Sequence, residues 1–303
     1  MKSTSTMNRI SEKQLDDVRR AVVALGNNLT PSILEQTTAL YAGLHDLEPP
    51  DDVAIIRDRA YGENERHRID LFKGVAGAAS GTALLFVHGG GFVAGDKRKP
   101  GSPFYENIGI WAARNGFLGA TMTYRLAPAS PWPAGADDVV AAAAWLAENR
   151  SAYGIDKIIL FGQSAGAAHV ATAVALQEQK LASCGAIGAI LLSGVYDLTI
   201  SNPNAISKAY YGDDASLYAA RSSQSGLAAA KMPMLVGTAE YDPAHFQRQT
   251  MGLIQALSGA RKVLPPLVQL LGHNHLSGVL HLGLPDDQLG LAIRLFAAEL
   301  KDA

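Results

Sequence analysis

A serine flanked by glycines at residues 162–166 is the first candidate for chemistry. The segment is Gly-Gln-Ser-Ala-Gly, with Ser164 at its centre. The apolar run Lys157–Phe161 before it predicts a strand, and residues 165–179 predict a helix. A sharp turn between the two needs small residues two positions before and after the serine, because larger side chains would clash. The pattern therefore predicts that Ser164 is a nucleophile, exposed at a helix N-terminus.

Three consecutive glycines form the second candidate. The segment His-Gly-Gly-Gly-Phe at residues 88–92 follows the apolar run Thr82–Val87. Successive glycines let backbone N–H groups approach a ligand closely, and a serine nucleophile needs such donors for the oxyanion of its tetrahedral intermediate. A phosphate-binding loop is the alternative, but no Lys-Ser/Thr pair follows and the G-x-G-x-x-G spacing is absent. The glycines therefore favour an oxyanion hole.

The two motifs together resemble the α/β-hydrolase fold, in its hormone-sensitive-lipase-like carboxylesterase family. The resemblance extends to residues 124–128 (Tyr-Arg-Leu-Ala-Pro), 133–138 and 210–214, and it covers residues 50–300 or so. It implies that the N–H groups of Gly90, Gly91 and Ala165 form the oxyanion hole.

A carboxylate and an imidazole are expected to follow in the chain order Ser, Asp/Glu, His. Glu240 and Asp242 both follow the apolar run Pro233–Val236, at a strand end where α/β sites are built. The resemblance favours Asp242 as the acid, with Glu240 as its competitor. Either residue could instead be a solvated loop charge, and Asp242 could cap the helix that follows.

Two histidines compete for the role of the base. His273 and His275 both follow the apolar run Leu267–Leu271. The catalytic imidazole must reach the serine with one nitrogen and the carboxylate with the other, and the alternation of side chains does not separate the two candidates. The resemblance favours His275, because family members often carry an apolar residue directly after the base, here Leu276. A zinc site is disfavoured, since no third ligand stands at metal spacing.

The elements that must position these residues alternate along the chain. Apolar runs predict buried strands at Thr82–Val87, Phe117–Thr123, Lys157–Phe161, Ile187–Leu192, Pro233–Val236 and Leu267–Leu271. Helical segments are predicted at Tyr105–Arg114, Ala136–Asn149, Ala165–Gln179, Ala244–Leu257 and Asp286–Leu300. This alternation predicts an α/β fold with a mostly parallel central sheet flanked by helices. Two strands, Val53–Arg57 and Arg68–Phe72, and two helices, Ser11–Gly26 and Pro31–His45, are predicted before it.

Two segments lie outside this alternation. Residues 197–229 form a polar insertion between two strands, and insertions of that length are usually lids or binding elements. Residues 1–47 would correspond to part of the cap in the family that the motifs resemble. We therefore expect a single α/β-hydrolase domain over residues 1–303, with a small helical cap from about 1–47 and 197–229.

The composition of the chain indicates which classes of partner and which cellular compartment to expect. With 26 Lys and Arg against 28 Asp and Glu, the net charge is −2, which leaves no basic surplus for a nucleic acid. The single cysteine, Cys184, excludes an internal disulfide. Residues 1–17 are polar, unlike a secretory signal, and no apolar run is long enough to span a bilayer. We expect a cytoplasmic protein without cofactor, metal or membrane partner; the resemblance implies a homodimer.

The function that these predictions favour is a serine carboxylesterase acting on short-chain esters through an acyl-enzyme. Ser164 would attack, His275 would transfer the proton and Asp242 would orient the imidazole. One alternative is an arylformamidase-type amidase using the same triad. The other is a catalytically silent relative that serves as a binding module. Turnover of a small ester by the wild type but not by Ser164→Ala would exclude the binding module.

Overall fold

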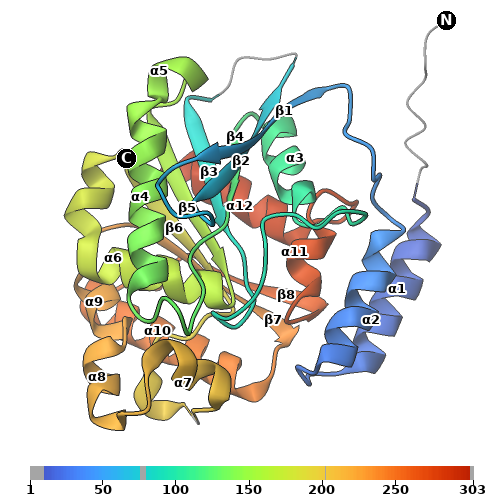
Figure 1. The fold of residues 1–303 in the computed structure, drawn as a ribbon. Helices are drawn as coiled ribbons and strands as arrows, with labels where there is room; N and C mark the ends of the chain where they lie inside the picture. The colour runs from blue at the N-terminus through green and yellow to red at the C-terminus, as the bar shows by residue number, and fades with distance from the viewer. Residues whose placement is uncertain (1–9, 76–79, 202, 301–303) are drawn as a thin grey trace, which may run out of the picture.

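The computed structural model describes residues 10–75, 80–201 and 203–300, and these residues form an eight-stranded sheet (Figure 1). The strand order is β1-β2-β4-β3-β5-β6-β7-β8. All neighbours from β4 to β8 pair in parallel, while β2 is antiparallel to both β1 and β4. The predicted mostly parallel sheet is confirmed. The strands are β1 (Val53–Ala60), β2 (Arg68–Gly74), β3 (Thr82–Val87), β4 (Leu118–Met122), β5 (Lys157–Gln163), β6 (Ala186–Leu192), β7 (Met234–Tyr241) and β8 (Leu267–Asn274).

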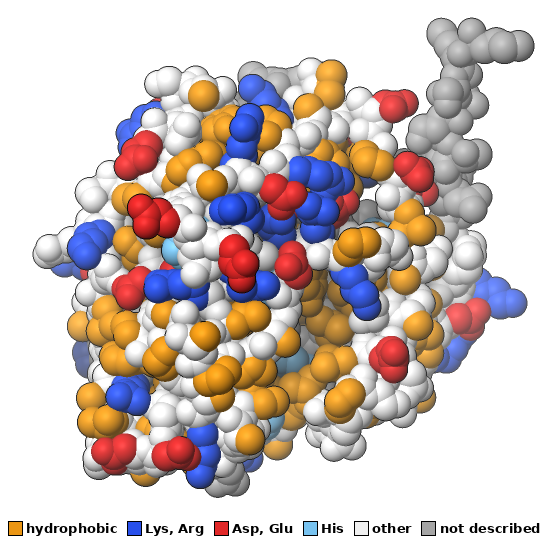
Figure 2. Space-filling model, in the orientation of Figure 1, with side chains coloured by type: hydrophobic (Ala, Val, Ile, Leu, Met, Phe, Trp, Pro, Cys, Tyr) orange, Lys and Arg blue, Asp and Glu red, His pale blue; other side chains and the backbone are white. Residues whose placement is uncertain are grey.

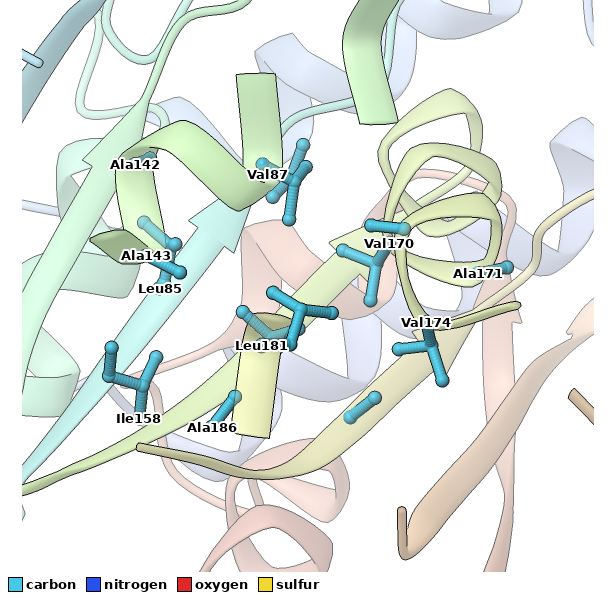
Figure 3. Close-up of a cluster of buried hydrophobic side chains, with 14 of the residues drawn as sticks. Leu85, Val87, Ala142, Ala143, Ile158, Val170, Ala171, Val174, Leu181 and Ala186 are labelled. Atoms are coloured by element: carbon cyan, nitrogen blue, oxygen red, sulfur yellow. The ribbon is translucent and has the colours of Figure 1, made fainter. Parts of the chain in front are cut away.

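Helices cover both faces of the sheet because its central strands are apolar on both sides. In β3, Leu85 and Val87 join one hydrophobic cluster, whereas Leu84 and Phe86 join the other. Figure 3 shows part of the first cluster, to which α4 and α6 contribute. The first face carries α4 (Ala134–Glu148), α6 (Ala165–Ser183), α9 (Gln224–Ala229) and α10 (Ala244–Arg261); the second carries α3 (Glu106–Arg114), α11 (Ser277–His281) and α12 (Gln288–Glu299).

Two N-terminal helices, α1 (Glu12–Leu25) and α2 (Pro31–Ala42), form a hairpin at one side of the molecule (Figure 1). Ser11 begins α1 with a capping box to Gln14, and Thr30 caps α2, as the sequence predicts. Tyr41 of α2 is fully buried and packs edge-on against His281 of α11. Residues 1–9 of the predicted N-terminal cap segment lie outside the described residues.

The insertion at residues 197–229 folds into short helices that the sequence analysis did not predict. They are η1 (Leu198–Ile200), α7 (Ala205–Tyr211), η2 (Ala215–Leu217) and α8 (Tyr218–Arg221), followed by α9. A further short helix, α5 (Arg150–Tyr153), precedes β5. In the described part of the chain, no helix is both long enough and apolar enough to cross a membrane.

The prediction that Leu267–Leu271 is a buried strand is wrong. This segment belongs to β8, which is the last strand of the sheet and pairs with β7 alone. Leu267 and Leu271 are 52% and 56% exposed. An apolar run has the same appearance at the centre and at the edge of a sheet, so the pattern could not distinguish the two. The strand also continues to Asn274, so that His273 lies within it.

Candidate active site

Ser164 occupies a tight turn between β5 and α6, as predicted. Its backbone has φ 56° and ψ −119°, a conformation that residues other than glycine rarely adopt. A Cβ atom on Gly162 would lie 2.4 Å from the carbonyl oxygen of Gly166, and one on Gly166 would lie 2.0 Å from that of Val87. Both flanking positions therefore require glycine, and the turn presents Ser164 at the N-terminus of α6.

A continuous series of hydrogen bonds joins Asp242, His275 and Ser164. His275 Nε2 lies 2.9 Å from Ser164 Oγ, and His275 Nδ1 lies 2.7 Å from Asp242 Oδ1. The three residues follow β7, β8 and β5, whose carboxyl ends meet at one edge of the sheet. With Asp242 ionised, Nδ1–H donates to the carboxylate, and Nε2 is free to accept the serine proton.

The carboxylate of Asp242 is buried and fully engaged. Its Oδ2 accepts hydrogen bonds from Ser193 Oγ (2.6 Å), Thr238 Oγ1 (2.7 Å) and the backbone N–H of Ala239 (2.7 Å). Burial opposes ionisation, but the hydrogen bonds from His275, Ser193 and Thr238 outweigh it and lower the pKa of Asp242. The group is therefore an anion at neutral pH, as an orienting carboxylate must be.

The two competing residues are engaged elsewhere. Glu240 Oε2 accepts the backbone N–H of Gly272 at 2.7 Å. His273 Nδ1 lies 3.0 Å from Ser277 Oγ, and burial lowers the pKa of His273 to about 3. The structure thus brings Asp242 and His275 to Ser164, and it gives Glu240 and His273 local structural contacts.

The glycine loop lies directly against Ser164. A Cβ atom on Gly89 would stand 3.2 Å from the Cβ of Ser164. Gly90 and Gly91 have φ values of 129° and 62°, which suit glycine. Tyr124 holds the start of the loop in place, since its hydroxyl donates a hydrogen bond to the carbonyl oxygen of His88 at 2.9 Å.

The backbone N–H groups predicted to form the oxyanion hole donate to no partner within the described part of the chain. Among the hydrogen bonds of the described residues, none uses the N–H groups of Gly90, Gly91 or Ala165. Ala165 is the first residue of α6, where the helix dipole adds to the attraction for negative charge. The three predicted donors therefore have no hydrogen-bond partner among the described residues.

Gln163 links the glycine loop to the histidine. Its Nε2 donates to the backbone carbonyl oxygen of His275 at 2.9 Å, and its Oε1 lies 2.6 Å from where a Cβ on Gly89 would stand. No pattern in the sequence predicted this role of Gln163 or the contacts of Ser193 and Thr238 with Asp242. One sequence feature could have indicated Ser193 as a site residue: it is the first polar residue after the apolar strand β6.

The two predicted cap segments both contact the surroundings of the site. Tyr210 of α7 stacks on Phe92 at the end of the glycine loop, with ring centroids 4.6 Å apart, and Ile206 Cγ2 lies 2.9 Å from where a Cβ on Gly91 would stand. Thr37 Oγ1 of α2 accepts a hydrogen bond from Asn274, next to His275.

The surface near the site is concave. A cavity of about 500 Å³ reaches Leu276, directly after the histidine, and it is bordered by Thr38 of α2 and Tyr105. Figure 2 shows a hollow on this face of the molecule, with hydrophobic side chains along much of its wall. The described residues contain no group of three or more His, Cys, Asp or Glu side chains that could hold a metal ion.

Comparison with known proteins agrees with this geometry. A family model for the alpha/beta hydrolase fold matches residues 84–275, which is more than half of the chain and includes Ser164, Asp242 and His275. The protein therefore belongs to the α/β-hydrolase fold family, and the resemblance drawn from its motifs is confirmed.

This chain matches less than a third of the length of each of three curated relatives. Lipase 2 of Moraxella sp. (strain TA144) is 40% identical over 86 residues, which are 28% of this chain and 19% of that protein. Tuliposide A-converting enzyme 2 of Tulipa gesneriana is 36% identical over 94 residues, 27% of this chain and 24% of the other. Esterase LipI of Mycobacterium tuberculosis is 37% identical over 91 residues, 29% of this chain and 27% of the other.

Solved structures match the whole fold. Esterase B of Lactobacillus rhamnosis has a TM-score of 0.70 at 17% identity, covering 96% of this chain and 97% of that one. A hyperthermophilic esterase from the archaeon Pyrobaculum calidifontis has a TM-score of 0.67 at 21% identity, covering 96% and 98%. At these identities the similarity establishes the fold.

Proposed function

We propose that the protein is a serine carboxylesterase that hydrolyses short-chain carboxylic esters through an acyl-enzyme. The observation that carries the proposal is the hydrogen-bonded series Asp242–His275–Ser164, with distances of 2.7 and 2.9 Å. The series ends beside a loop with unpaired backbone donors, so a nucleophile, a base and an oxyanion site converge on one point.

The reaction begins when Ser164 Oγ attacks the ester carbonyl carbon and His275 Nε2 accepts its proton. Asp242 holds the imidazole in place and stabilises the imidazolium. The imidazolium then gives its proton to the departing alcohol, which leaves an acyl group on Ser164. A water molecule attacks this acyl-enzyme with His275 as the base again, and the carboxylic acid is released.

The carbonyl oxygen carries negative charge in both tetrahedral intermediates. Donors from Gly90, Gly91 and Ala165 stabilise it more in the transition state than in the bound ester, and each is worth on the order of 3 kcal/mol. No cofactor takes part in this scheme.

The proposed preference for short acyl chains is supported by the limited space beside the glycine loop. Ile206 of α7 stands over Gly91, where it limits the space beside the oxyanion hole. The relatives are named as a lipase and an esterase, and esterase B was solved in a form inhibited by a C4-C4 SN3 tributyrin phosphonate. These properties belong to those proteins, and they support an ester as the substrate here.

The deciding experiment is a panel of p-nitrophenyl acetate, butyrate, octanoate and palmitate together with N-formylkynurenine. We expect the wild type to favour acetate and butyrate, and Ser164→Ala to lose activity by several orders of magnitude while it stays folded. A fluorophosphonate should label Ser164 in the wild type alone. Equal, negligible turnover by both proteins would contradict the proposal, and preference for N-formylkynurenine would favour an amidase.

A cytoplasmic location and a homodimer complete the proposal. The first is supported by the single cysteine and the second by the family resemblance. Cell fractionation and light scattering coupled to size-exclusion chromatography test them.

A further inference from the structure

Phe246 is a buried aromatic residue that the mechanism above does not use. It lies in the first turn of α10, four residues after Asp242, and is 7% exposed. The clusters of buried hydrophobic side chains formed by the described residues do not include it. Because buried aromatic rings usually pack within such clusters, the position of Phe246 has to be explained by its other neighbours.

Phe246 contacts two imidazoles. The ring of His245, the preceding residue, is tilted against it, with centroids 4.1 Å apart. The ring of His275 is stacked on it, with centroids 4.2 Å apart and an interplanar angle of 28°. The imidazole of His275 is held at its edge by the contacts to Asp242 and Ser164. A contact on the face and hydrogen bonds in the plane restrain the same ring in perpendicular directions, so that neither tilting nor rotation is free.

Phe246 and Asp242 come from the same short stretch of chain. The backbone N–H of Phe246 donates to the carbonyl oxygen of Pro243 at 2.9 Å, which forms the first turn of α10. Gln247 Nε2 donates to the carbonyl oxygen of Glu240, also at 2.9 Å, and ties this turn to the end of β7. The carboxylate at the edge of the imidazole and the Phe246 ring on its face therefore keep a fixed relation to each other.

We propose that Phe246 is a positioning residue for the proposed ester hydrolysis. Its ring holds the imidazole of His275 in the one plane that serves both Asp242 and Ser164, and it keeps water away from the Asp242–His275 hydrogen bond. An aromatic face also attracts the imidazolium that forms when Ser164 loses its proton. The inference rests on the proposed function, since it assigns Phe246 to that reaction.

The test compares Phe246→Leu, which removes the ring but fills the space, with Phe246→Tyr, which keeps the aromatic face. Phe296→Leu is the matched control, because Phe296 is also a buried ring, 3% exposed, and lies on α12. Turnover of p-nitrophenyl acetate is normalised to the number of active sites titrated with a fluorophosphonate. We expect Phe246→Leu to lower kcat on the order of tenfold with KM within about twofold. Phe246→Tyr should restore most of kcat, and Phe296→Leu should lower Tm alone.

A second measurement does not depend on turnover. The Nδ1–H proton of His275 should give a downfield NMR signal in the wild type, because it is held between the imidazole and Asp242 and shielded from water. In Phe246→Leu this signal should exchange with solvent faster, while it persists in Phe246→Tyr and Phe296→Leu.

Two outcomes would overturn the inference. One is an unchanged kcat per active site in Phe246→Leu, and the other is an equal loss in the Leu and Tyr variants. If the wild type hydrolyses no ester, the proposed function fails instead. The NMR signal then decides the inference, and equal exchange in wild type and Phe246→Leu would overturn it.

Discussion

Gly91 has a backbone conformation that lies in the left-handed region, with φ 62°. A Cβ atom there would stand 2.9 Å from Ile206 Cγ2, so an added methyl group would push the loop and the helix apart. We predict that Gly91→Ala lowers kcat on the order of 10²-fold with little change in KM, because a displaced N–H group no longer reaches the oxyanion. Steady-state kinetics on p-nitrophenyl acetate measures both constants.

Gly101→Ala is the control for the energy cost of placing a side chain on a residue with positive φ. Gly101 also has a positive φ, 73°, but nothing lies within 4 Å of its Cβ position. Gly101→Ala should therefore lose about 1 kcal/mol of stability and keep its kcat. Equal losses of kcat in the two variants would contradict the assignment of Gly91. Gly90 is a poorer position for this test, because its Cβ would lie 2.0 Å from the carbonyl oxygen of Ala94.

His275 and His273 differ in surroundings although they are two residues apart. His275→Ala should lower kcat almost as far as Ser164→Ala, because members of a triad act as a unit. His273→Ala removes a buried ring and the partner of Ser277, so it should cost about 2 kcal/mol of stability and keep most of kcat. Kinetics and urea unfolding of both variants measure these effects, and the reverse ranking of kcat would make His273 the base.

The residues of the site were predictable to the extent that local geometry determines them. The turn around Ser164 and the glycine loop need particular residue types at fixed spacing, so the sequence alone identified both. Asp242 and His275 had competitors two residues away, and only the family resemblance separated them. Gln163, Phe246 and Ser193 act on partners between 29 and 112 residues away, and no local pattern indicates such contacts.

The helix α7 carries an exposed aliphatic side chain next to the glycine loop. Ile206 is 46% exposed, and Tyr210, one turn later, anchors the helix by stacking on Phe92. We predict that Ile206→Ala widens the space beside the oxyanion hole and raises kcat/KM for p-nitrophenyl octanoate relative to acetate, roughly tenfold for two or three additional buried methylenes. The ratio of the two kcat/KM values is the measurement.

Ile200 offers a matched control on the same insertion. It is 48% exposed and lies in η1, and it is not among the side chains near Gly91. Ile200→Ala should leave the ratio unchanged. If Ile206→Ala does the same, the insertion does not limit the acyl chain, and its interpretation as a cap has to be abandoned.

The secondary-structure elements were predictable where burial and periodicity agree. β3 was predicted with its observed bounds, because all six of its residues are buried between two helical layers. The short helices of residues 197–229 were not predicted, since segments of three to seven residues carry too few turns to show a period. β8 was predicted to be buried because its sequence is apolar, but it lies at the edge of the sheet. The order of the strands is a property of the whole sheet, so the sequence of a single strand does not determine its position.

Buried histidines make the stability of the whole molecule sensitive to acid. Burial lowers the pKa of His88 to about 4 and the pKa values of His169 and His273 to about 3, from an ordinary value of 6.5. Below pH 6.5 the unfolded chain therefore binds protons that the folded protein does not, so the free energy of unfolding falls as the pH falls. Each histidine contributes about 1.4 kcal/mol per pH unit until its folded pKa is reached.

We predict that unfolding at pH 5 requires roughly 4–6 kcal/mol less than at pH 7. The lowered pKa of Asp242 acts in the same direction at still lower pH, because protonation removes its hydrogen-bonded anion. Urea unfolding at constant ionic strength measures the difference. A midpoint that does not change between pH 7 and pH 5, with an unchanged m-value, would contradict the buried neutral state of these histidines.

The edge position of β8 determines how heat would inactivate the protein. The nucleophile and the glycine loop follow β5 and β3, each of which has a neighbouring strand on both sides, whereas His275 follows a strand with one neighbour only. Strands at an edge open locally at a lower free-energy cost than central strands. Opening of β8 would carry the base away from Ser164 while the rest of the sheet stays intact. The upper limit of the working temperature would then be set by the fraying of one strand, below the temperature at which the sheet melts, and cooling would restore activity without any refolding of the core.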